Sequence, residues 1–156
     1  MEFGNMIENL IEPALRIAAA VVAGGIVGLN RDLHGKPTGV RAHALVALGA
    51  AVFVMSSTDL GISGSDSNVV SRVIQGIVGG IGFLGAGVIL RGDDGQRIFH
   101  VATAASIWVT AAMGVACGLG AWRLVFLSLF AVVLILVLGT KIDHALYGKL
   151  GQEADQ

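Results

Sequence analysis

The sequence predicts an all-α, polytopic membrane protein of five transmembrane helices. Hydrophobic residues make up 54% of the chain and charged residues 13%, with a mean hydropathy of +0.79. Soluble domains carry about 25% charged residues, so a chain this apolar needs lipid as its solvent. Each span takes about 20 residues, and five spans therefore fill nearly all of the 156 residues. We expect one membrane domain over residues 1–140 and a short cytoplasmic tail over 141–156.

The segment Val69–Arg91 is the expected centre of the bundle. It is long enough to cross a bilayer and is rich in glycine. In water each glycine costs a helix roughly 1 kcal/mol relative to alanine. In hydrocarbon the backbone has no alternative partner, and missing side chains let helices approach closely. We expect a helix-packing motif built from small and aromatic residues of this span and a later one: Gly76, Gly80, Gly82, Phe83, Gly85, Gly87, Thr103 and Trp108.

The first span is expected over about Leu10–Leu29. Pro13 suits the first turn of a helix, where its missing N–H costs little. Glu12 and Arg16 are four residues apart and are expected to pair near the membrane surface. The N-terminus has acidic residues where a signal peptide needs basic ones, so this helix is expected to be retained.

Three further spans are expected over Val40–Thr58, Val101–Leu119 and Ala121–Gly139. The last has bulky aliphatic residues on every face, which is typical of a helix exposed to lipid. Glycines spaced four apart predict close-contact ridges on the first and fourth spans: Gly24 and Gly28, and Gly114 and Gly118.

Basic residues indicate the orientation of the bundle. Five spans place the termini on opposite sides, and seven of the ten basic residues fall on the side of the C-terminus. The positive-inside rule therefore predicts an N-terminus outside and a C-terminus in the cytoplasm. The seven are Arg31, Lys36, Arg41, Arg91, Arg97, Lys141 and Lys149.

Polar side chains at membrane depth are costly and mark functional candidates. An inner polar cluster is expected where three loops should meet: Asn30, Arg31, Asp32, Arg41, His43 and Arg91. An outer polar pair, Arg72 and Gln75, lies near the opposite end of the third span. Two simpler readings stay open: Arg72 extending to lipid headgroups, and His43 as a hydrogen-bonded packing residue.

Several classes of function are not expected. The chain has no phosphate loop, CxxC pair or HExxH motif, and no nucleophile with a histidine at helical spacing, so we expect no enzymatic activity. No basic run with interleaved aromatic residues suggests nucleic-acid binding. The single cysteine, Cys117, allows no disulfide within the chain and is interpreted as a packing residue.

Magnesium transport by one protomer finds little support in the residues. Magnesium favours carboxylates and gives up its waters reluctantly. The acids near the membrane are Glu12 at one face and Asp32, Asp93 and Asp94 at the other, with none in the middle of the spans. A dication would need backbone carbonyls at the glycines or an oligomer axis, and the metal ligands stay undetermined.

Three stretches in order, GLNRDLHGKPTGVRAHALVALGAAVF, QGIVGGIGFLGAGVILR and TAASIWVTAAMGVACGLG, resemble the MgtC/SapB family of bacterial inner-membrane proteins. Positions that match the family motifs are Arg31, Asp32, Gly39, Arg41, His43, Gly80, Gly82, Phe83, Leu84, Gly85, Gly87, Arg91, Thr103, Ala104, Ala105 and Trp108. Asn30 stands where the family usually has glutamate, and Ala42 and Ala102 stand where it usually has threonine. Val101 also departs from the small residue or leucine usual at its position.

The resemblance implies a multi-pass protein of the bacterial inner membrane linked to magnesium homeostasis and, in some members, to survival inside host cells. Some members are thought to restrain ATP synthase, and others are regarded as magnesium transporters. Longer members carry a soluble C-terminal domain, so this chain is expected to be a short member. Two hypotheses remain: a protein acting through contacts with other membrane proteins, or an ion transporter or channel. The glycine ridges predict a homo-oligomer, with a dimer as the first guess.

Overall fold

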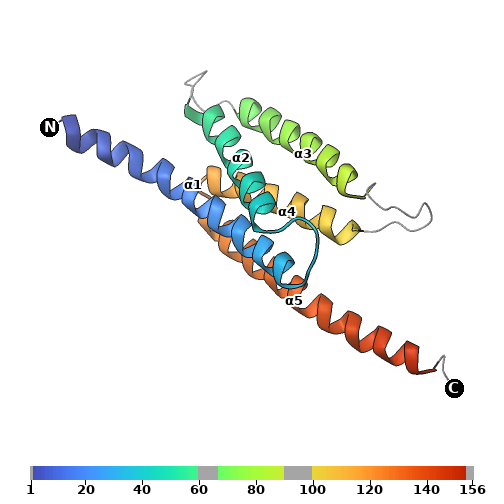
Figure 1. The fold of residues 1–156 in the computed structure, drawn as a ribbon. Helices are drawn as coiled ribbons and strands as arrows, with labels where there is room; N and C mark the ends of the chain where they lie inside the picture. The colour runs from blue at the N-terminus through green and yellow to red at the C-terminus, as the bar shows by residue number, and fades with distance from the viewer. Residues whose placement is uncertain (1, 60–66, 90–99, 154–156) are drawn as a thin grey trace.

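The computed structural model describes residues 2–59, 67–89 and 100–153. In this part of the chain there are five helices and no strand, which confirms the predicted all-α class (Figure 1). Each helix contains a stretch long and apolar enough to cross a membrane. The helices are α1 Glu2–Leu33, α2 Val40–Asp59, α3 Ser67–Ile89, α4 Val101–Gly118 and α5 Trp122–Glu153. Which side of the membrane each end faces stays a prediction.

The first and last helices run past their expected ends. Helix α1 begins at Glu2, so Pro13 lies inside the helix rather than in its first turn, contrary to the prediction. Its apolar span, Leu10–Leu33, continues one turn beyond the expected end. Helix α5 continues to Glu153, so most of the expected tail is helical.

The core of the bundle is formed by α1, α2 and α4, which meet at glycines. A Cβ atom added at Gly24 of α1 would lie 2.5 Å from the carbonyl oxygen of His43 in α2. One added at Gly114 of α4 would lie 2.3 Å from the carbonyl oxygen of Ala47 in α2. Gly28 and Gly118 make similar approaches, so both predicted ridges are confirmed. Helix α2 is therefore held from two sides by backbones that only glycine can bring so close.

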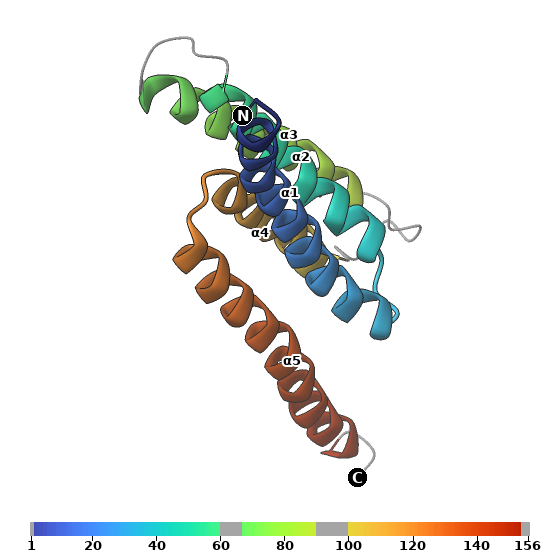
Figure 2. The same ribbon diagram turned by 90° about the vertical axis from the view of Figure 1, so that its left-hand side faces the viewer.

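The expected central position of α3 is wrong. A Cβ atom added at Gly76, Gly79, Gly80, Gly82 or Gly87 would meet nothing within 4 Å, and Phe83 is 82% exposed. Gly85 alone of the α3 glycines faces a neighbour, since its added Cβ would lie 3.6 Å from the Cβ of Ala104 in α4. Figures 1 and 2 show α3 at the edge of the bundle, beside α2 and α4. A run of glycines makes a helix face bare, but it does not dictate which helix, if any, covers that face.

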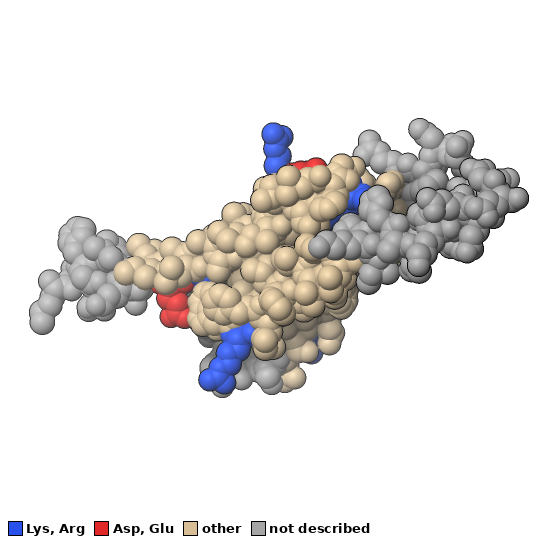
Figure 3. All heavy atoms as spheres, turned by 90° about the horizontal axis from the view of Figure 1, so that it is seen from below, with Lys and Arg blue, Asp and Glu red and all other residues tan. Residues whose placement is uncertain are grey.

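Over Trp122–Gly139, the part of α5 whose side chains the structure describes, the helix is mostly exposed, as its sequence predicts. Phe126, Leu127 and Ile135 are each at least two-thirds exposed, and Val125 is buried against α1 and α4 residues. The view in Figure 2 shows α5 leaning away from the other helices. Figure 3 shows a described surface dominated by residues other than Lys, Arg, Asp and Glu, as lipid contact requires.

Candidate functional site

One face of α4 carries three buried hydroxyl groups. Thr103, Ser106 and Thr110 lie three and four residues apart, so they share one face of the helix. All three are at most 5% exposed. Thr103 was predicted only as a packing residue, and Ser106 and Thr110 were not predicted. Their spacing within an alanine-rich span was the signal that could have found them.

Arg31, in the last turn of α1, reaches this hydroxyl face. Its side chain is buried, with 6% exposure, and its Nη2 donates a hydrogen bond to Oγ1 of Thr103. Its Nε is buried without a hydrogen-bond partner. Within the described side chains Arg31 forms no ion pair, so a positive charge is held among helices without a carboxylate against it. Such an arrangement costs free energy, so Arg31 is a candidate functional residue.

His43, one turn into α2, reaches the same face and is fully buried. Its Nδ1 lies 3.1 Å from the carbonyl oxygen of Gly39, and its Nε2 lies 3.1 Å from Oγ of Ser106. Ser106 Oγ in turn lies 2.7 Å from the carbonyl oxygen of Thr103. We call Arg31, His43, Thr103 and Ser106 the buried polar cluster. It joins α1 and α2 to α4.

Asp32 has a structural role in the loop that precedes α2. Its Oδ2 accepts a hydrogen bond of 3.0 Å from the backbone N–H of Val40, the first residue of α2. This bond satisfies an N–H that would otherwise lack a helical partner. Gly39 has no room for a side chain there, because an added Cβ would lie 1.6 Å from Oδ1 of Asp32. Asp32 is exposed and lies outside the buried polar cluster.

The expected inner polar cluster is only partly brought together. Arg31 and His43 meet on α4, whereas the side chain of Arg41 is exposed. The carbonyl oxygen of Asn30 is bonded to the ring Nδ1 of His34, at 2.7 Å. Arg91 lies outside the described residues. The spacing of Arg41 and His43, two residues apart on one helix, points their side chains in different directions, which explains the separation.

The expected outer pair, Arg72 and Gln75, is exposed on α3. At that end of the bundle the structure instead places Arg16 in the more enclosed position. Arg16 pairs with Glu12, as predicted, and its Nη1 also donates a 2.9 Å hydrogen bond to the carbonyl oxygen of Gly118. A cation thus satisfies a terminal carbonyl of α4, where the helix dipole favours it.

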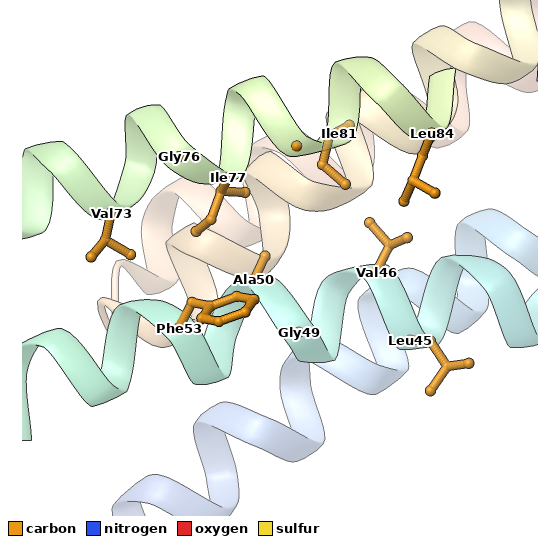
Figure 4. A pocket seen from close by; sticks show the side chains of 11 residues that line it. Leu45, Val46, Gly49, Ala50, Phe53, Val73, Gly76, Ile77, Ile81 and Leu84 are labelled. Carbon is orange, nitrogen blue, oxygen red and sulfur yellow. The ribbon is translucent and has the colours of Figure 1, made fainter. Parts of the chain in front are cut away.

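A hollow of about 660 Å³ lies between α2 and α3. It has an apolar lining from both helices, and Figure 4 shows Ile77 and Ile81 pointing from α3 toward α2, with Val46 pointing back. Gly76 and Gly80 leave the α3 wall bare. The remaining lining residues are Leu45, Gly49, Ala50, Phe53, Val73 and Leu84. We call this space the α2–α3 hollow. No group of three or more His, Cys, Asp or Glu side chains that could hold a metal ion occurs among the described residues.

Known proteins resemble this chain over almost all of its membrane part. The MgtC family profile matches residues 17–145. The chain belongs to the MgtC family. Protein SrpB of Synechococcus elongatus is 39% identical over an alignment of 133 positions, and the alignment covers 79% of this chain and 72% of SrpB. Together with the five apolar helices, this membership makes the chain a multi-pass membrane protein.

Relatives named Protein MgtC are longer than this chain. The one from Salmonella typhimurium is 43% identical over 109 residues, and the one from Brucella abortus is 42% identical over 111 residues. These alignments cover 70% and 71% of this chain but 44% of each relative. The chain therefore spans less than half of the MgtC proteins it matches. No solved structure matches it.

Proposed function

We propose that this MgtC-family protein lies in the bacterial inner membrane, supports adaptation to low magnesium, and acts by contact with other membrane proteins. The link to magnesium rests on the family. The mode of action rests on one observation: α3 offers a face of bare glycines beside the apolar α2–α3 hollow, and no helix of the described chain covers it. Without a hydrophobic force between helices in lipid, such small-residue faces are where membrane helices associate.

The interior of the bundle argues against a path for a dication through one protomer. The charged side chain held deepest between α1 and α4 is Arg31, a cation without a carboxylate partner among the described side chains. The α2–α3 hollow has no charged residue in its lining. A hydrated magnesium ion needs oxygen ligands to cross such surfaces. Contact with a partner therefore has more support than transport.

Two kinds of partner fit the proposal. A second copy of the chain would form a homo-oligomer, with a dimer as the simplest assembly. The second kind of partner is another membrane complex, and the family resemblance suggests ATP synthase as that complex. Both would meet the protein through the exposed face of α3, inside the lipid.

Growth in low magnesium tests the proposal. We expect the wild-type chain to restore growth to a strain that lacks its own copy. The double variant Gly76→Leu/Gly80→Leu, which fills the α2–α3 hollow, should lose most of this effect. The matched control is Gly25→Leu on α1, which makes no contact with α3; an added Cβ there also meets nothing within 4 Å, and this variant should retain growth. Full complementation by the double variant would contradict the proposal.

Purified protein in liposomes tests the transport hypothesis directly. We expect no magnesium uptake above that of empty vesicles. Robust uptake that disappears in Asp32→Ala would contradict the proposal and establish an ion transporter instead.

A further inference from the structure

The hydrogen-bond geometry around His43 can accommodate a second proton on the imidazole ring. The Gly39 carbonyl oxygen can only accept, so the proton of a neutral His43 must lie on Nδ1. Nε2 is then an acceptor and takes the hydroxyl proton of Ser106. The same hydroxyl has a second acceptor 2.7 Å away, the Thr103 carbonyl oxygen. A serine hydroxyl has one proton, so in the neutral form these two acceptors compete for it, although the Thr103 carbonyl oxygen also has its helical N–H partner in α4.

We propose that His43 is a proton-binding site inside the membrane bundle, with the hydroxyl group of Ser106 as the rotor that accommodates the added proton. A proton from the loop side binds the lone pair of Nε2. Nε2–H then donates to Ser106 Oγ, and the Ser106 hydroxyl donates to the Thr103 carbonyl oxygen. Every polar atom of this chain of bonds then has a partner, and the bundle gains one positive charge.

The position of His43 suits such a site. It lies one turn into α2, and Gly39 and Thr38 in the adjoining loop are partly exposed, so water reaches the first turn of the helix. Its ring connects α2 to α4 through Ser106. Protonation therefore reverses the direction of the bond between the two helices without requiring either helix to move.

The charged groups around His43 oppose one another. Burial of the ring disfavours the added charge most. From α1, Arg31 disfavours it further, and Asp32 at the end of that helix favours it. On α2, Arg41 is exposed to solvent, where its charge is screened. From α4, the groups that face His43 are hydroxyls and carbonyls, and the titratable residue nearest along that helix is His100, at its start. In the charged form, the Gly39 carbonyl oxygen accepts the proton on Nδ1, and Ser106 Oγ accepts the proton on Nε2.

Nitrogen NMR of histidine in lipid bilayers tests the proposal. The chain has four histidines, and the variant His34→Gln/His100→Gln/His144→Gln leaves His43 as the only one. At about pH 8 we expect two different ring nitrogens, with the proton on Nδ1; by about pH 5 both should carry protons. A His43 spectrum that stays neutral over this range would overturn the proposal. The wild-type chain, in which the His43 signals are found by comparison with His43→Gln, provides the same test if the triple variant does not fold.

Variants of α4 test the role of the hydroxyl rotor. In Ser106→Ala the charged ring loses the acceptor for Nε2–H, so the transition should move about one pH unit lower. The matched control, Thr110→Ala, removes another buried hydroxyl of α4, whose one hydrogen bond within the described chain goes to the Ser106 carbonyl oxygen at 2.8 Å. It should leave the transition in place, as should Ser106→Thr, which keeps a hydroxyl. A transition that is unchanged in Ser106→Ala, or that moves equally in Thr110→Ala, would overturn this role.

Discussion

Replacing Gly114 with alanine is expected to destabilise the bundle by about 1–3 kcal/mol, the usual cost of overpacking a filled contact. The added Cβ would lie 2.3 Å from the Ala47 carbonyl oxygen and 2.8 Å from its Cα. Both are backbone atoms, so no side chain can rotate away, and α2 and α4 must separate. The gain in helix propensity on replacing glycine, roughly 1 kcal/mol, does not offset this clash.

The only cysteine of the chain reports on this change. Cys117 is fully buried, so a thiol-reactive dye labels it only when the bundle opens. We expect Gly114→Ala to be labelled at a lower temperature than wild type. The matched control is Gly79→Ala, where an added Cβ meets nothing within 4 Å, and its labelling temperature should be equal or higher. Equal labelling temperatures for Gly114→Ala and Gly79→Ala would contradict the close contact between α2 and α4.

Replacing His43 with alanine is expected to lower the free energy of unfolding by about 3 kcal/mol. The ring is fully buried, so its loss leaves a cavity between α2 and α4. Its hydrogen bond to Ser106, which joins the two helices, is lost with it. Unfolding in increasing concentrations of a denaturing detergent, followed by circular dichroism, measures the change.

His34→Ala is the matched control for this second substitution. His34 is exposed and bonds the Asn30 carbonyl oxygen within its own turn, so its loss should change stability by about 0.5 kcal/mol or less. If both variants unfold at the same detergent concentration as wild type, His43 does not hold α2 against α4.

Composition and spacing predicted the membrane class, the number of helices and their approximate bounds, because transfer into lipid depends mainly on how many apolar residues follow one another. The ridges at Gly24 and Gly28 and at Gly114 and Gly118 were also predicted correctly. Their partner, α2, presents small residues such as Ala47 and Ala51, and small residues on both helices are what close contact needs.

The central position of α3 could not be predicted, because a glycine-rich face looks the same in sequence whether a helix or lipid covers it. The site was predicted only in part, and the reason is related. Arg31 and His43 stand out as ionisable groups at membrane depth, but Ser106 and Thr110 are common in membrane helices, where they bond their own backbone. Only the fold shows that the hydroxyl of Ser106 also faces a buried histidine.

The most direct test of a core made by α1, α2 and α4, with α3 at its edge, is disulfide formation between α3 and α4 in a Cys117→Ala background. An added Cβ at Gly85 would lie 3.6 Å from the Cβ of Ala104, which suits a disulfide, so Gly85→Cys/Ala104→Cys should cross-link within one chain under mild oxidation. Gly79→Cys/Ala104→Cys should not, because Gly79 lies six residues, about 9 Å, along α3 from Gly85 and an added Cβ there meets nothing within 4 Å. Cross-linking of the Gly79 pair but not of the Gly85 pair would contradict this arrangement.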